Sequence, residues 1–135
     1  MNDQTAQECR HIIPARAFAG KQGLNYFEGI AAENVGARAI CMHILRMPPG
    51  ARAKAHQHDG HETAIYMVSG EVHTRYGDRL QHEVIVRAGE IFYIPAGMPH
   101  LPENRSSAES VAVIARTDPR EQESVTLLPH LDPMT

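Results

Sequence analysis

Short stretches of alternating apolar and polar residues, separated by turn-forming residues, recur along most of this 135-residue chain. Residues 71–76 are one example, in which polar and less polar side chains alternate as they do on a strand with one buried face. The pattern predicts strands over residues 25–30, 37–47, 63–69, 71–76, 81–87, 91–94 and 110–116. No segment keeps a 3.6-residue period over ten or more residues. The chain is therefore expected to be an all-β barrel or sandwich.

The strand pattern divides the chain into three parts. Residues 1–24 are predicted to form an N-terminal arm, residues 25–117 the barrel, and residues 118–135 a C-terminal tail. Within the tail, the β-type run at 124–128 could add an edge strand, which we expect at a dimer interface. A length of 135 residues fits a single domain with a core of its own.

Composition narrows the classes of partner. The formal net charge is -3 and the pI is about 6.3, which argues against nucleic acid or an anionic membrane as the partner. No apolar run approaches the roughly 18 residues of a membrane span. The polar N-terminus shows no secretory signal, so a cytoplasmic location is expected. The two cysteines, Cys9 and Cys41, form neither a zinc-binding pattern nor a disulfide framework.

A His-x-His pair is the strongest indication of chemistry. On a strand, His56 and His58 lie on the same face, about 6.6 Å apart, so that both rings can tilt toward one metal ion. On a helix the two rings would point away from each other. A third histidine, His100, follows a Pro-Ala-Gly-Met-Pro turn and is the natural candidate to complete the site.

Two motifs in this region resemble those of the cupin superfamily. The first cupin motif, G-x5-H-x-H-x3,4-E-x6-G, is nearly matched by Gly50, His56, His58, Glu62 and Gly70. The second, G-x5-P-x-G-x2-H-x3-N, is matched at every position by Gly89, Pro95, Gly97, His100 and Asn104. The chain thus resembles a small single-domain cupin of the conserved-barrel type. The resemblance implies a double-stranded β-helix, or jelly-roll barrel, in which both motifs contribute to one metal site.

The first motif departs from the family pattern in one spacing. Seven residues, rather than six, separate Glu62 from Gly70, so counting back from Gly70 reaches Thr63. Because threonine is a poor ligand for a transition metal, a β-bulge that turns Glu62 inward is the preferred interpretation. His61 remains an alternative fourth ligand. The predicted ligands are therefore His56, His58, Glu62 and His100, with Glu62 also a candidate catalytic base.

The sequence pattern does not decide which side chains of two strands point into the barrel. In one strand the inward residues are either 63, 65 and 67 or 64, 66 and 68, and in the other they are either 92 and 94 or 91 and 93. Either choice gives a mainly apolar cavity suited to a small organic molecule. His43, if it points inward, would also line it. Asn104 is expected to tie a loop through side-chain hydrogen bonds.

The candidate metal ligands and the apolar cavity together favour a metal-dependent enzyme. We expect one divalent transition metal per chain, and the ligand types are compatible with Fe, Mn, Ni, Cu or Zn. The leading hypothesis is a dioxygenase-type oxidoreductase acting on a small organic substrate. The alternatives are a metal-dependent isomerase or lyase, and a non-catalytic module that binds a small molecule or metal. Cupins commonly pair through edge strands, so the resemblance also implies a homodimer.

Overall fold

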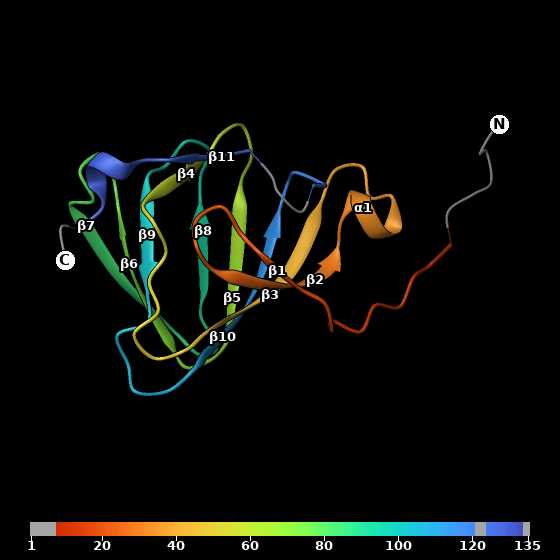
Figure 1. Ribbon diagram of the computed structural model, residues 1–135, viewed down its shortest axis with the longest axis horizontal. Coiled ribbons are helices and arrows are strands. Elements are labelled where there is room, and N and C mark those ends of the chain that lie inside the picture. Colours follow the sequence, from red (N-terminus) through yellow and green to blue (C-terminus); the bar gives the residue numbers. More distant parts are fainter. Residues whose placement is uncertain (1–7, 121–123, 134–135) are drawn as a thin grey trace.

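The chain forms two antiparallel β-sheets that face each other, as the computed structural model shows (Figure 1). The structure describes residues 8–120 and 124–133, so parts of the expected arm and tail lie outside it. The first sheet has the strand order β1-β2-β3-β10-β5-β8, and the second has the order β11-β4-β9-β6-β7. This two-sheet arrangement confirms the all-β jelly-roll fold.

The six-stranded sheet contains β1 (Ala17–Ala19), β2 (Asn25–Ile30), β3 (Cys41–Met47), β5 (Thr63–Ser69), β8 (Ile91–Ile94) and β10 (Ser110–Arg116). The five-stranded sheet contains β4 (His56–His58), β6 (Glu71–Tyr76), β7 (His82–Arg87), β9 (His100–Glu103) and β11 (Val125–Leu127). A short helix, α1 (Ala32–Val35), follows β2, and the 3-10 turn η1 (Pro129–Leu131) follows β11.

The alternation of side chains located most strands correctly. Five predicted strands (25–30, 63–69, 71–76, 91–94 and 110–116) have the observed bounds, while β3 and β7 begin four residues and one residue later than predicted. The strand β9 was not predicted, because Pro102 within it argues against a strand. It is held by pairing with β6 and β4 rather than by a sequence pattern of its own.

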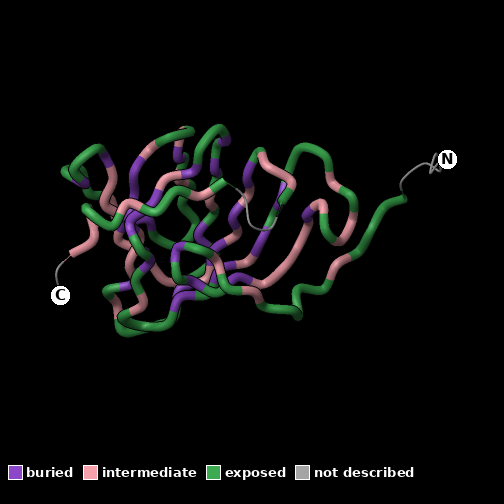
Figure 2. Tube along the Cα trace, turned by 45° about the horizontal axis from the view of Figure 1, so that its top comes forward, coloured by how far each residue is buried: buried purple, intermediate pink, exposed green. Residues whose placement is uncertain are grey.

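The hydrophobic core lies between the two sheets, where Figure 2 shows the buried segments gathered. It joins inward side chains of the six-stranded sheet, such as Leu45, Met67 and Ile114, to Val72 and Val86 of the five-stranded sheet. The inward positions of β5 and β8 are 63, 65 and 67 and 92 and 94, which decides between the two phases that the sequence allowed.

Both ends of the described chain add to the sheets. Strand β1 pairs with β2, and Phe18 packs against the core. Strand β11 pairs with β4 of the same chain and is an edge strand of the five-stranded sheet. Beyond it, Leu128 and Leu131 pack against a second small core. None of the helices among the described residues has the length and apolar character needed to cross a membrane.

A β-bulge interrupts β5 near its end. Ser69 pairs with Val111 of β10 and Met67 with Ala112, so Val68 is an extra residue in β5. This bulge accounts for the additional residue between Glu62 and Gly70. It lies far enough from Glu62 that side chains keep alternating from His61 through Met67, and it does not turn Glu62 inward.

Candidate metal centre

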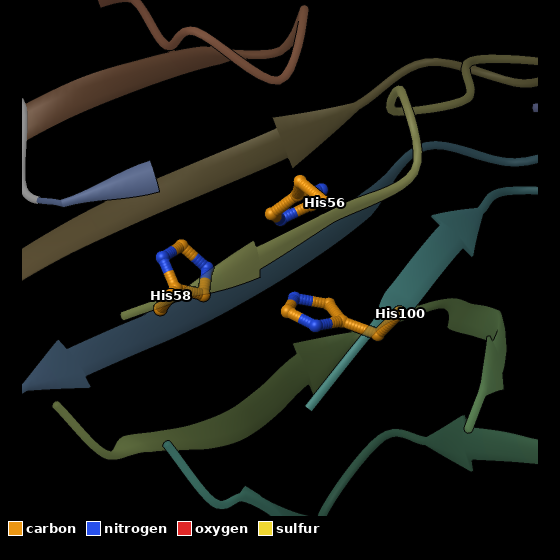
Figure 3. A group of neighbouring side chains, drawn as sticks. All are labelled: His56, His58 and His100. Carbon is orange, nitrogen blue, oxygen red and sulfur yellow. The ribbon is translucent and has the colours of Figure 1, made fainter. Parts of the chain in front are cut away.

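Three histidines from two neighbouring strands meet inside the barrel. His56 and His58 lie at the two ends of β4, and His100 begins β9, where it pairs directly with His56. Their ring centroids are 4.2 to 5.2 Å apart, and Figure 3 shows the three rings grouped around one space. One nitrogen from each ring lies within 4.8 Å of the other two. The expected meeting of the two motif segments is what the structure shows.

The strands and a turn hold this geometry. On β4, alternation places both histidines on the inner face, while Gln57 between them is only partly buried. The turn before β9 is tied across to β4, since the Gly97 N–H donates to the His58 carbonyl at 2.9 Å. Gly97 has a φ of 75°, a conformation that glycine adopts without steric cost.

In His56 and His100, a hydrogen bond from one ring nitrogen determines which nitrogen is left to face the cluster. The Nδ1–H of His56 donates to the Lys54 carbonyl at 2.6 Å, and that of His100 donates to the Met98 carbonyl at 2.8 Å. A carbonyl can only accept, so each Nδ1 carries the proton in the neutral ring. Nε2 of both rings therefore keeps its lone pair for a metal ion. Such bonds from the second nitrogen also fix ring orientation.

Burial keeps the three rings neutral. Desolvation is the main cause that lowers the pKa of all three histidines, to about 2 for His58, to about 4 for His100, and well below the usual value for His56. The positive charge of Arg116 lowers each pKa further. Neutral imidazole is the form that binds metals. The site therefore does not need to lose protons at neutral pH before a metal binds.

An internal cavity of about 50 Å³ adjoins the three histidines. Most of its lining side chains are apolar and come from both sheets, among them Leu45, Met67 and Phe92. Thr63, Thr74 and Arg116 are polar members of the lining. Sequence reasoning missed Arg116, because a strand-end arginine is usually solvated and only the pairing of β10 between β3 and β5 brings its side chain inside.

Glu62 points away from the three histidines, although it was expected to be a metal ligand. Its side chain is exposed, and its carboxylate accepts a hydrogen bond of 2.8 Å from the Tyr93 hydroxyl. The group of potential ligand atoms found among the described residues holds the three histidines without Glu62. Instead, Thr63 points inward beside them and is 2% exposed. The reason is the position of the bulge, which leaves the alternation around Glu62 intact.

His61 is buried next to the cluster without being part of it. Its ring centroid lies 5.0 Å from that of His58. Its Nδ1 lies 3.3 Å from the Ser124 hydroxyl and 3.7 Å from a carboxylate oxygen of Asp118. These contacts orient the ring toward the C-terminal segment. His61 therefore packs behind His58 in this structure and supports its position.

The surroundings of His43 and Asn104 show what each of these two residues does in the fold. His43 points inward from β3 but packs edge-on against Phe18 and Tyr26, and it is not among the residues lining the cavity. Asn104 is fully buried, and its side-chain amide donates to the carbonyls of Met47 and Ala108, each at 2.8 Å. The predicted role of Asn104 in tying a loop is confirmed.

The donor set fits a divalent transition metal. Three neutral imidazoles, two of them with the Nε2 lone pair left available by hydrogen bonds at Nδ1, are a donor set that could hold one such ion. The ligand types do not select among Fe, Mn, Ni, Cu and Zn. Three protein ligands would leave further coordination positions of such an ion open, as in catalytic rather than structural sites.

Comparisons with known proteins agree with this fold. A family model described as a cupin domain matches residues 43–115, a range that includes all three histidines. The 3-hydroxyanthranilate 3,4-dioxygenase of Bos taurus is 33% identical over 69 residues, which are 50% of this chain and 24% of that protein. The chain thus spans about a quarter of this curated relative.

Solved structures share the fold at lower identity. An oxalate oxidase in complex with the substrate analogue glycolate has a TM-score of 0.67 and 21% identity, over 83% of this chain and 60% of that one. A Bacillus subtilis oxalate decarboxylase, described for its Mn(II) centres, has a TM-score of 0.68 and 20% identity, over 80% of this chain and 29% of that one. At these identities the similarity establishes the fold alone.

Proposed function

The chain belongs to the cupin family, and we propose that it is a metal-dependent, dioxygenase-type enzyme that acts on a small organic substrate. The observation that carries the proposal is the cluster of three buried histidines that opens onto an apolar cavity. The match to a dioxygenase over half of the chain supports the same class of reaction. The proposed ligands are His56, His58 and His100.

In this proposal some residues would bind the metal ion, and others would shape the cavity around it. The histidines hold the ion on one wall, while the apolar side chains exclude water and confine the substrate. A bound divalent metal would polarise a substrate oxygen as a Lewis acid and, if redox-active, pass electrons toward O2. Glu62, which faces outward, is not proposed as a ligand.

A metal-dependent lyase or isomerase is the second candidate, because the same three histidines could also hold a redox-inactive metal. An isomerase must move a proton between carbon atoms, which needs a positioned base. The residues found to line the cavity in the described chain include no carboxylate, so this candidate ranks below the dioxygenase. Full turnover under nitrogen with a redox-inactive metal would reverse this order.

The first test is elemental analysis of protein purified without a histidine tag or chelator. We expect near-stoichiometric metal in the wild type and less than about 10% of that in His58→Ala, because the open site loses one of three ligands. Glu62→Gln is the matched control and should keep its full metal content. Circular dichroism would show whether each variant remains folded.

The outcomes separate the candidates. Unchanged metal occupancy in His58→Ala would rule out the ligand assignment, whereas loss of metal in Glu62→Gln would restore Glu62 as a ligand. A metal-loaded protein that consumes no O2 with any enol, diketone or catechol-like substrate would exclude the dioxygenase. If the wild type takes up no metal on reconstitution, a non-catalytic small-molecule-binding module becomes the better interpretation.

A further inference from the structure

The strand that carries two of the three histidines is held on both edges, and more extensively by the C-terminal part of the chain. On one edge, β4 pairs with β9 at one position, His56 with His100, and a turn donates one hydrogen bond to the His58 carbonyl. On the other edge, β11 pairs with all three residues of β4, with Val125 opposite His58 (Figure 1). The placement of His56 and His58 therefore depends on a segment that is distant in the sequence.

We call residues 124–132 the C-terminal strap, and its last residue holds the backbone where β4 begins. The Ala55 N–H donates to the Asp132 carboxylate at 2.6 Å, and the Ala55 carbonyl accepts from the Leu128 N–H at 2.9 Å. Ala55 is fully buried and directly precedes His56. Because a buried N–H needs a hydrogen-bond partner, the Asp132 carboxylate fixes the backbone next to this histidine.

A second set of contacts holds the backbone where β4 ends. The Asp59 N–H donates to the Ser124 carbonyl at 3.0 Å, and the Ser124 hydroxyl donates to the Asp59 carbonyl. The Thr126 hydroxyl donates to the Asp59 carboxylate. The Ser124 hydroxyl also lies 3.3 Å from Nδ1 of His61, whose ring packs behind His58. The strap thus contacts the chain on both sides of the His-x-His pair.

Apolar side chains fix the strap behind the candidate ligands. Leu128 and Leu131 pack against a small core that includes Ala55 and Leu101. Because His100 lines the cavity, alternation along β9 places Leu101 on the opposite face of the sheet. Ala55 and Leu101 are both fully buried, and each is next in sequence to a candidate ligand. The residues on which the strap docks are therefore direct neighbours of the ligands.

We propose that the C-terminal strap positions the metal site, with Asp132 as its positioning residue, and that docking of the strap and binding of the metal stabilise each other. This inference rests on the metal centre of the proposed function and adds a means of regulating it. The docked strap holds His56 and His58 on one short strand, so both rings stay directed at one ion. Coupling between two sites is reciprocal, so an ion that binds better with the strap docked also holds the strap in place.

The zinc affinity of the full chain, measured by competition with a chromophoric chelator, tests the role of Asp132. Asp132→Ala removes the acceptor for the Ala55 N–H and should weaken zinc binding about tenfold or more, as is typical of residues that orient metal ligands. Asp132→Asn removes the charge but keeps an oxygen acceptor, so its affinity should stay within about threefold of the wild type. Asp78→Ala removes an exposed carboxylate between β6 and β7 and should not change the affinity.

Hydrogen exchange of the wild type with and without zinc tests the coupling. The Leu128 N–H donates to the Ala55 carbonyl and so reports docking of the strap. Zinc should slow its exchange at least about fivefold more than that of the amides in β7, which lies at the far edge of the same sheet. A strap that only stabilised the fold would not show this dependence on zinc. The measurement needs no variant, so it decides the proposal even if Asp132→Ala does not fold.

The strap and the metal centre fail in different ways. Wild-type zinc affinity in Asp132→Ala overturns the strap proposal, and so does an equal loss of affinity in Asp132→Asn, because the acceptor would then not be what matters. A Leu128 exchange rate that zinc slows no more than the rates in β7 also overturns it. In each of these cases the wild type still binds zinc and the metal centre stands. A wild type that binds no zinc would instead overturn the metal centre, together with the coupling of the strap to it.

Discussion

At the scale of single residues, the central feature is the neutral state of the buried histidines. His56 and His100 each donate from Nδ1 to a backbone carbonyl two residues earlier in the chain, so a local contact determines which nitrogen faces the cluster. Burial then lowers the pKa of these rings. The same two effects prepare the rings for a metal and make the metal-free protein sensitive to acid.

We predict that the metal-free protein loses stability as the pH falls below about 6.5. Burial lowers the pKa of His100 from 6.5 to about 4, so between these values the unfolded chain binds more protons than the folded one. The free energy of unfolding therefore falls as the pH decreases, by on the order of 3 kcal/mol for this residue. Urea unfolding at pH 7, 6, 5 and 4 measures this change.

His100→Gln is the control for this effect. Glutamine does not titrate, so the variant should lose part of the pH dependence between pH 6.5 and 4, whatever its stability at pH 7. The same slope in the variant and in the wild type would show that other groups cause the acid sensitivity.

At the scale of elements, β5 decides which side chains enter the cavity. Its bulge at Val68 lies next to the turn at Gly70, which leads into β6. Gly70 has a φ of 74°, and a Cβ atom there would lie 2.7 Å from the Glu109 carbonyl oxygen and 2.8 Å from the Cα of Ser110. The turn thus requires glycine both for its backbone conformation and for the close approach of the chain before β10.

We predict that Gly70→Ala lowers the free energy of unfolding by more than Gly50→Ala does. Both glycines have positive φ, but a Cβ at Gly50 meets nothing within 4 Å, so Gly50→Ala reports the conformational cost alone, about 1 kcal/mol. Steric overlap with backbone should add about 1–3 kcal/mol in Gly70→Ala. Thermal and urea unfolding of the two variants give the comparison, and equal losses would contradict the contact.

At the scale of the whole molecule, one edge of the six-stranded sheet exposes apolar side chains. Ile91 and Tyr93 of the edge strand β8 are 75% and 55% exposed, and Tyr66 and Val68 of the neighbouring β5 are about half exposed. An apolar patch beside an open sheet edge favours association with another copy of the chain. The homodimer expected from the sequence remains a prediction, as does the placement of the tail strand β11 at its interface. The patch on β8 and β5 is our proposal for a second possible interface.

Ile91→Lys tests this interface. A charge placed on the patch should shift the protein toward the monomer, with at least a tenfold weaker dimerisation constant, because burying an unpaired lysine is unfavourable. Light scattering coupled to size-exclusion chromatography measures the mass of both proteins over a range of concentrations. Arg87→Lys keeps an exposed charge and should leave the mass unchanged. A wild type that is monomeric at all concentrations would contradict the prediction.

The sequence determined most of the long strands and the three histidines. Alternation of side chains is a local property, so the bounds of β2, β5, β6, β8 and β10 could be predicted from the residues of each segment alone. The spacing of His56 and His58 also has a local meaning, since alternation on a strand places both on one face. The motif containing His100 and Asn104 then indicated the third histidine and the residue that ties the following loop.

Only the tertiary structure decided what surrounds those histidines. Whether Glu62 or Thr63 faces inward depends on where the bulge lies, and its position at Val68 follows from the pairing of β5 with β10, which are distant in sequence. The same pairing brings Arg116 beside Thr63 and into the cavity. Strand register depends on contacts across the whole barrel. The charge of the cavity could therefore be derived only once the two sheets were in place.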